Sequence, residues 1–314
     1  MTKLFLFIFS LLLSSHIAFS QNKVSISIDD IPNTRLYERD IYQSPFLKKL
    51  NALALPIAIY INEGNLYKTD SVQLNIDLLD SWASQDFVTL GNHSFNHSRY
   101  SQVGLDSFKT DIIKGESRTR KLAKKYQKAL KHFRFPYNDL GKDSTQHFHI
   151  RNFLREEGYQ ISPFTIESSD WMYNRVYAYY LKQNDLNKAK QIGQAYVTMT
   201  LEYFDFFEKF CLEHYGRSVN HIYLCHDNKL NADYLDQIVE ELKQQDYQFI
   251  SLDEALEDPI YKQKDAYYKK WGISWLYRWQ DFQKDRIKSM RLEPSTKDIE
   301  DLFKQINNKK DKAY

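Results

Sequence analysis

The stretch KVSISIDD, residues 23–30, decides the fold class. Its three apolar residues alternate with polar ones, which is the period of a β-strand with one apolar face. The strand is expected to end on Asp29 and Asp30, whose side chains would point to opposite sides of a regular strand. One of them would then bind a cation while its neighbour is free for another role. The alternative is a turn or a helix cap, which accounts for many single aspartates.

Strands and helices alternate along the rest of the chain. Apolar runs predict extended segments at 55–61, 86–90, 159–166, 222–225 and 247–252, and amphipathic runs predict helices at 71–83, 105–130, 145–157 and 232–244. This alternation predicts an α/β fold with a largely parallel sheet, either a barrel or a doubly wound sheet.

Two segments lie outside that alternation. Residues 173–216 form an aromatic-rich, mostly helical stretch that is longer than a usual connection, and we expect either a wall of the site or packing outside the sheet. The tail, residues 259–314, carries no metal or nucleophile pattern, so we interpret it as packing and solubilising structure. The domain hypothesis is one unit over 21–258 that contains the helical insert, followed by this C-terminal extension.

The N-terminus has the pattern of a secretory signal peptide. Lys3 precedes an apolar run at 4–13, and the small-residue stretch Ala-Phe-Ser follows at 18–20. A membrane anchor is the alternative, but a spanning helix needs about 20 apolar residues. We therefore predict cleavage near residue 20 and an exported mature protein, periplasmic or secreted, without a membrane span.

Charge and cysteine content exclude some classes of protein. Lysine and arginine number 43 against 41 for aspartate and glutamate, so net charge gives no reason to expect a nucleic acid or a membrane surface as partner. Two cysteines cannot form the disulfide framework of so large a domain. Cys211 and Cys225 could pair in an oxidising compartment or stay as buried thiols.

The candidate reactive side chains follow the ends of predicted strands, where ligands gather in parallel α/β folds. They are Asp29, Asp30, His93, His97, Arg134, Asp170 and His226. His93 and His97 are four residues apart, and a helical turn at that point would place both imidazoles on one face. Two neutral histidines and one carboxylate suit a divalent metal. A histidine pair at this spacing is, taken alone, more often surface or core structure.

Five segments in this order resemble the motifs of the polysaccharide deacetylases, the NodB-homology family known as carbohydrate esterase family four. The segments are SIDD (27–30), HSFNH (93–97), RFPY (134–137), SDW (169–171) and LCHD (224–227). The resemblance covers about residues 23–256, and five ordered motifs are far more specific than any one of them. Ser27-Ile28, Phe135 and Glu167 depart from the usual residues, but none of these changes removes a ligand or a proton-transfer group.

The resemblance implies a distorted, incomplete (β/α) barrel and hydrolytic deacetylation without a covalent intermediate. Asp30, His93 and His97 would bind a divalent metal, most commonly zinc, with cobalt, nickel or manganese as alternatives. Asp29 would act as general base toward water. His226 would act as general acid toward the leaving amine.

The resemblance also implies supporting roles for four residues. The backbone N–H of Tyr137 would help to hold the oxyanion, and Arg134 would orient the general base through paired hydrogen bonds. Asp170 would raise the pKa of the general acid, and Trp171 would form an apolar wall for the acetyl methyl or sugar ring. Without the motif order, the simpler interpretations would be a surface ion pair for Arg134, a loop cap for Asp170 and a core residue for Trp171.

We expect the chain to remove acetyl groups from the nitrogen, or alternatively the oxygen, of a saccharide. A second hypothesis is an amidohydrolase that acts on a small C–N bond outside sugars, and the export signal argues against it. A third is a saccharide-binding module without activity. Such a module would not need Asp29 and His226, which are both present.

Overall fold

The computed structural model describes residues 22–38 and 42–311. Over these residues the centre is an eight-stranded sheet with the order β5-β4-β3-β2-β1-β7-β6, and β8 also pairs with β1. The strands are β1 (Lys23–Ile31), β2 (Ile57–Ile61), β3 (Val88–Asn92), β4 (Leu130–Phe133), β5 (Gln160–Ile161), β6 (Ile166–Glu167), β7 (Asn220–His226) and β8 (Gln248–Phe249). Each described pairing is parallel.

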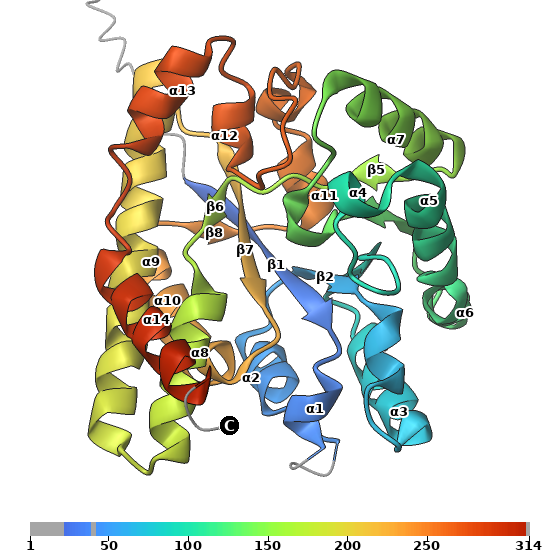
Figure 1. Cartoon of the computed structure of the whole chain (residues 1–314), viewed down its shortest axis with the longest axis vertical. Helices are drawn as coiled ribbons and strands as arrows, with labels where there is room; N and C mark the ends of the chain where they lie inside the picture. The colour runs from blue at the N-terminus through green and yellow to red at the C-terminus, as the bar shows by residue number, and fades with distance from the viewer. Residues whose placement is uncertain (1–21, 39–41, 312–314) are drawn as a thin grey trace, which may run out of the picture.

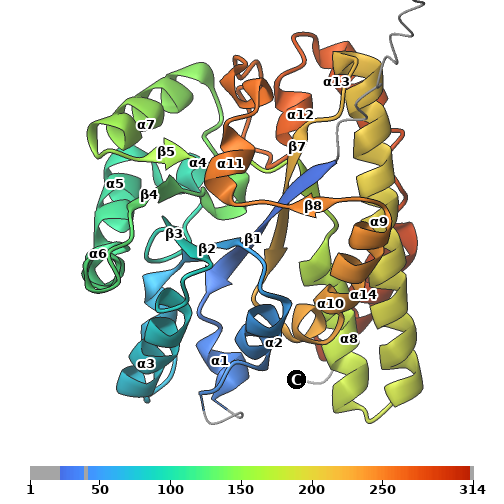
Figure 2. The same cartoon turned by 180° about the vertical axis from the view of Figure 1, so that it is seen from behind.

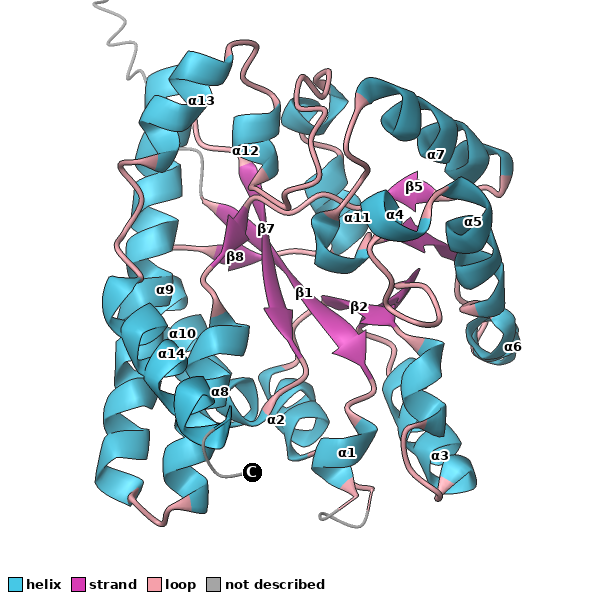
Figure 3. Cartoon of the chain, viewed as in Figure 1, coloured by secondary structure: helices cyan, strands magenta, loops and turns pink. Residues whose placement is uncertain are grey.

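The sheet curls into a half-barrel that does not close (Figures 1 and 3), as the predicted incomplete barrel requires. β5 and β6 follow each other in sequence but stand at opposite ends of the strand order. The single extended segment predicted at 159–166 is therefore two short strands. The residues between them cross the open side of the barrel.

Helices surround the sheet (Figure 2). Those of the barrel are α1 (Thr34–Tyr37), α2 (Pro45–Leu53), η1 (Glu63–Tyr67), α3 (Val72–Ala83), α4 (Tyr100–Val103), α5 (Leu105–Lys114), α6 (Ser117–Lys125), η2 (Pro136–Asn138), α7 (Ser144–Glu156), α10 (Lys229–Gln244) and α11 (Leu252–Leu256). The main core lies between helices and sheet, and a smaller cluster with Tyr60 and Ile222 lies on the other face of the strands. Both faces of β1 are buried, because Ser25 and Ser27 on its polar side are fully covered.

The prediction of one continuous helix at 105–130 is wrong. The chain forms α5 and α6 with a break at Gly115, and β4 already begins at Leu130. A Cβ added to Gly115 would lie 2.4 Å from the carbonyl carbon of Ser94. The break therefore lets the backbone lie directly against the loop that carries the two histidines.

The insert and the tail complete the molecule. The insert contains α8 (Asp170–Lys182) and α9 (Leu186–Tyr215), and the tail contains η3 (Pro259–Lys262), α12 (Trp275–Arg278), α13 (Gln283–Met290) and α14 (Lys297–Asp311). α14 lies beside α8 on the same side of the barrel in both views (Figures 1 and 2). Tyr173 and Tyr177 of the insert are buried, so these two rings pack in the core and do not offer a stacking surface to a ligand.

The tail also covers the open side of the barrel. The N–H of Trp275 donates to the carbonyl of Phe164 at 3.0 Å, and the hydroxyl of Ser274 donates to the carbonyl of Thr165 at 2.6 Å. Both acceptors belong to the segment that joins β5 to β6. Residues 274 and 275 of the tail are thus attached to the connection between the two ends of the sheet.

Other sequence predictions have different outcomes. The predicted signal peptide, residues 1–20, lies outside the described residues. Within them, no helix combines the length and the apolar character that crossing a bilayer requires. Cys211 and Cys225 are both buried and unpaired.

Candidate metal site and catalytic pocket

A cavity of about 660 Å³ opens at the carboxyl ends of β1, β3 and β7. Its lining includes seven of the nine residues singled out from the sequence: Asp29, Asp30, His93, His97, Tyr137, Trp171 and His226. The other two, Arg134 and Asp170, are fully buried behind the wall and contact Asp29 and His226 respectively. The structure therefore brings the whole predicted set to one place.

The two aspartates do not point to opposite sides, contrary to the expectation for a regular strand. Asp30 has φ +66°, and the pairing register of β1 with β2 shifts between Ile28 and Ile31. This bulge turns both carboxylates toward one histidine: Asp29 Oδ2 and Asp30 Oδ1 each lie 3.7 Å from His93 Nε2. Both aspartates can therefore serve one reaction centre.

The loop from His93 to His97 is not the helical turn that the spacing suggested. Ser94 and His97 have φ +62° and +56°, which a right-handed helix does not allow. The side chain of Asn92 accepts from the N–H of Ser94 at 2.8 Å. Asp111 accepts hydrogen bonds from the N–H groups of the next two residues, Phe95 and Asn96. These polar contacts replace helical hydrogen bonds and still place the two imidazoles side by side, with ring centroids 4.9 Å apart.

Asp30, His93 and His97 offer one ligand atom each, and these atoms lie within 4.8 Å of one another. His93 Nδ1 lies 2.8 Å from the carbonyl oxygen of Arg134, which can only accept, so this nitrogen carries the proton. The lone pair of Nε2 then faces the carboxylates, as in metal-binding histidines that are oriented by a backbone carbonyl. Burial lowers the pKa of His97 to about 4, so its ring is neutral at pH 7. Two neutral imidazoles and a carboxylate are a donor set that fits a divalent cation such as zinc.

Arg134 lies next to Asp29 but does not make the expected paired hydrogen bonds. Its Nη1 is 3.6 Å from Asp29 Oδ1, while Nη2 donates to the hydroxyl of Ser27 at 3.1 Å and to the carbonyl of Pro163 at 3.2 Å. The guanidinium also stacks over the ring of Tyr60, 4.4 Å from its centroid. These contacts fix the cation within the barrel, so that it acts on Asp29 through its charge.

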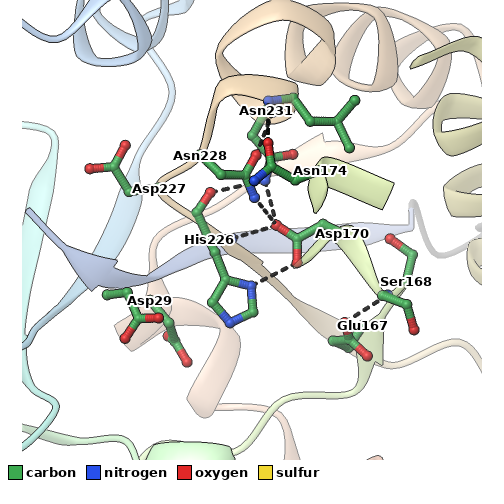
Figure 4. A network of polar contacts seen from close by, with 12 residues as sticks. Asp29, Glu167, Ser168, Asp170, Asn174, His226, Asp227, Asn228 and Asn231 are labelled. Carbon is green, nitrogen blue, oxygen red and sulfur yellow. Dashed lines mark hydrogen bonds and ion pairs between the residues drawn. The ribbon is translucent and has the colours of Figure 1, made fainter. Parts of the chain in front are cut away.

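His226 is held by Asp170 at the other side of the cavity (Figure 4). His226 Nδ1 lies 2.7 Å from Asp170 Oδ1, and the backbone N–H of His226 donates to Oδ2 at 2.9 Å. The side-chain amides of Asn228 and Asn231 also donate to Oδ2, at 2.8 and 2.6 Å. Burial by itself would lower the pKa of His226, but the charge and hydrogen bond of Asp170, together with the charges of Asp30 and Asp29, raise this pKa to about 10.

Exposed aromatic rings surround the opening of this cavity. Tyr137 has φ +56°, and its ring, 47% exposed, lies between the ring of His97 and the guanidinium of Arg99. Trp171 is 49% exposed and rests edge-on against Phe303 of α14. Neither ring is a core residue, but the Tyr137 ring is in contact with His97 and Arg99, so Trp171 offers the more open surface to a ligand.

Sequence reasoning missed two acidic groups of the pocket. Burial raises the pKa of Asp227 to about 7, and burial together with Asp170 raises the pKa of Glu167 to about 7. Asp227 accepts hydrogen bonds from Asn33 and Tyr37, and points away from the His226 ring. Its place directly after His226 in the last motif was the available signal.

The interpretation of the tail as packing structure alone is incomplete, because Trp271 and Gly272 line the cavity. A Cβ added to Gly272 would lie 2.2 Å from the carbonyl oxygen of Tyr137. The tail thus contacts the site through the backbone of a glycine. A search for ligand or nucleophile patterns has no means of finding such a contact.

Comparisons with known proteins agree with this site. The family model described as polysaccharide deacetylase matches residues 16–160, which contain the aspartate pair, both histidines and Arg134. No curated protein shows a significant match to the chain.

The two BA3943 structures share the fold with this chain at low sequence identity. A mutant of BA3943, described as a CE4 family pseudoenzyme, is 14% identical with a TM-score of 0.51, over 76% of this chain and 68% of that one. Wild-type BA3943 from Bacillus anthracis is 13% identical with a TM-score of 0.51, over 76% of this chain and 66% of that one. The Bc1960 peptidoglycan N-acetylglucosamine deacetylase is 18% identical with a TM-score of 0.49, over 76% of this chain and 89% of that one. By the model match over residues 16–160 and by its ordered motifs, the chain is similar to the polysaccharide deacetylase family.

Proposed function

We propose that the protein is a metal-dependent hydrolase that removes acetyl groups from an acetylated saccharide. The observation that carries this proposal is the arrangement of one cavity. Its centre holds the convergent atoms of Asp30, His93 and His97, with the carboxylate of Asp29 on one side and the His226–Asp170 pair on the other. A metal site, a base and an acid are the three parts that hydrolysis of an amide requires.

Asp30, His93 and His97 would hold the metal. A divalent cation bound there would polarise the acetyl carbonyl and lower the pKa of a water molecule from 15.7 to about 7. We propose zinc as the ion, with cobalt, nickel and manganese as alternatives. The two imidazole nitrogens favour these ions over calcium and magnesium, which prefer oxygen ligands.

Asp29 is the proposed general base. Its carboxylate is buried, and its Oδ1 lies 3.6 Å from Nη1 of Arg134. Asp29 Oδ1 is buried on the side of Arg134, whereas Oδ2 lies 3.7 Å from His93 Nε2 and is the oxygen proposed to accept the proton that water loses when it attacks the acetyl carbon. Arg134 is a positioning residue, since it contacts the base and lies outside the cavity lining.

His226 is the proposed general acid. Its Nδ1 is engaged by Asp170, so Nε2 is the nitrogen that can give its proton to the leaving amine when the C–N bond breaks. A pKa of about 10 keeps the ring protonated at neutral pH. The products are acetate and a free amino sugar. The backbone N–H of Tyr137, in a left-handed turn beside His97, is proposed to support the oxyanion together with the metal.

The exposed rings of Trp171 and Trp271 at the cavity support a saccharide as substrate in preference to a small amide. Flat aromatic faces pack well against the apolar faces of sugar rings. The presence of Asp29 and of the His226–Asp170 pair favours catalysis over the binding-module hypothesis. We also propose export to the periplasm or beyond the cell, on the pattern of residues 1–20.

Acetate release tests this function. Purified protein is stripped with a chelator and reloaded separately with zinc, cobalt, nickel and manganese. It is then assayed on peptidoglycan fragments, chitooligosaccharides, acetylxylan and simple acetamides. We expect acetate from one or more of the saccharides and none from the chelated protein. Absence of acetate with all four ions would refute the proposal, and turnover of acetamides alone would favour the amidohydrolase.

A further inference from the structure

A second cavity, of about 360 Å³, adjoins the metal cavity, and the indole of Trp271 borders both. It is lined by Ser101, Gln102, Lys142, Lys269, Lys270 and Trp271, and we call these six residues the cationic compartment. Three of them carry ammonium groups. None of the five motifs contributes to it, and half of its lining comes from the tail.

The positive charge of this compartment is not neutralised within the protein. Over the residues that the structure describes, no ion pair involves Lys142, Lys269 or Lys270, and none involves Arg99 at the rim of the metal cavity. Some lysines elsewhere on the surface are paired, such as Lys125 with Asp80 at 2.7 Å, and others are not; what distinguishes this compartment is that three unpaired ammonium groups line one cavity.

Two carboxylates lie near the cationic compartment, but both have other partners. Asp139 is buried and accepts from the hydroxyl of Ser101 and from the N–H of Gly141 at 2.9 Å. Asp143 caps α7, where it accepts from the N–H of Gln146 at 2.9 Å. The ammonium groups therefore remain available to an anion from outside.

The two cavities differ in charge across a single aromatic ring. The metal cavity is lined by four carboxylates, those of Asp29, Asp30, Glu167 and Asp227, whereas the lining of the cationic compartment has none. Trp271 is 58% exposed, and the backbone of the next residue, Gly272, lies against the Tyr137 carbonyl. Lys270 Nζ lies 4.9 Å from the centroid of the indole. A cation next to an exposed aromatic face can bind a sugar ring together with its anionic substituent.

We infer that the substrate is an acidic saccharide. The acetylated unit occupies the metal cavity, and a neighbouring unit packs on Trp271 with its carboxylate, sulfate or phosphate among Lys142, Lys269 and Lys270. This inference rests on the proposed function and adds the class of saccharide to it. The tail of the chain is then the part that selects the substrate.

Binding measurements test the inference separately from turnover. Calorimetry with the zinc-loaded full chain carrying Asp29→Asn compares a hyaluronan tetrasaccharide, its methyl ester, chitotetraose and 6-O-sulfated chitotetraose. We expect the charged member of at least one matched pair to bind about tenfold more tightly than its neutral form, since two or three exposed ion pairs contribute on this order. The advantage should shrink between about 50 and about 300 mM salt. The hyaluronan and sulfate pairs distinguish a carboxylate from a sulfate as the anion.

Variants of the tail locate the effect. Lys269→Gln/Lys270→Gln should remove most of the advantage of the charged ligand and leave neutral chitotetraose unchanged, while Trp271→Ala should weaken both. Lys262→Gln/Lys264→Gln removes the same charge from exposed positions of the same tail that line neither cavity, and should have no effect. Equal affinity for charged and neutral ligands, or an equal effect of the two lysine pairs, would overturn the inference.

The proposed function is judged independently. If the wild-type protein releases acetate from neutral and acidic saccharides with the same kcat/KM, and binding shows no charge preference, only the inference fails. If no metal ion supports acetate release but binding of the charged saccharide depends on Lys269 and Lys270, the proposed function fails and the inference that the protein binds an acidic saccharide is retained.

Discussion

The carboxylate of Asp170 contacts His226 at two points, through Nδ1 of the ring at 2.7 Å and through the backbone N–H at 2.9 Å. The side chain and the main chain of the histidine are thus held by one buried anion. Because the anion keeps the ring charged, its removal should act on the protonation of His226 more than on its position.

Asp170→Asn is therefore expected to change the pH dependence of deacetylation. The acid must be protonated, so wild-type activity should fall as pH rises through about 10, the raised pKa of His226. Without the Asp170 carboxylate, only Asp30 and Asp29 oppose the effect of burial, so this pKa should fall and the alkaline limb should move to lower pH. The profile of kcat against pH for both proteins, at equal metal content, checks this. An unchanged alkaline limb would exclude His226 as the acid.

Asp29→Asn should separate metal binding from turnover. The amide keeps the shape of the side chain but cannot take a proton, so kcat should fall by about 10² to 10⁴ with little change in zinc content. Acetate release and metal analysis of the same sample measure both. If the variant lost its metal and regained its rate on reloading, the roles of Asp29 and Asp30 would have to be exchanged.

Metal removal should lower thermal stability as well as activity. A ligand at about 100 times its Kd stabilises the folded chain by about 2.7 kcal/mol, so chelation should lower Tm by several degrees. His97→Ala should abolish the response of Tm to added zinc. His149→Ala, a change at an exposed histidine of α7, serves as the control and should retain the response. A zinc response that survives in His97→Ala would contradict the site.

Gly115→Ala should damage the metal site from a distance. The new Cβ would lie 2.4 Å from Ser94, so the histidine loop must move, at a cost of about 1–3 kcal/mol. Zinc affinity should fall with stability. Gly158→Ala has no atom within 4 Å of its Cβ but a φ of +76°, so it should cost stability through backbone strain and leave zinc affinity unchanged. Equal zinc affinity in Gly115→Ala and wild type would contradict the role of this contact.

The site could be predicted from the sequence wherever a motif follows the end of a predicted strand. The pattern of apolar residues predicted β1 and its neighbouring strands. Because the carboxyl ends of parallel strands lie at one edge of the sheet, the sequence also predicted that Asp30, His93 and His97 would converge. Orientation was harder, because it depends on single left-handed residues. Asp30 reverses the expected alternation of the aspartate pair, and Ser94 and His97 replace a helical turn by a hydrogen-bonded loop.

Contacts between segments far apart in sequence could not be predicted at all. Arg134 donates to Ser27 and Pro163 instead of forming a fork on Asp29, since the barrel interior offers it other acceptors. The place of Trp271 beside the site depends on a glycine that fits against the Tyr137 backbone, and neither residue type signals such a contact.

The two hydrogen bonds from residues 274 and 275 to the segment between β5 and β6 have a consequence for biosynthesis. All three proposed metal ligands precede residue 100, whereas Trp271, which borders the cavity, is made about 170 residues later. A nascent chain can therefore gather its metal ligands early but gains its complete substrate surface only near the end of translation. Shortened expression variants that end near residue 258 would retain the metal ligands and lack this surface.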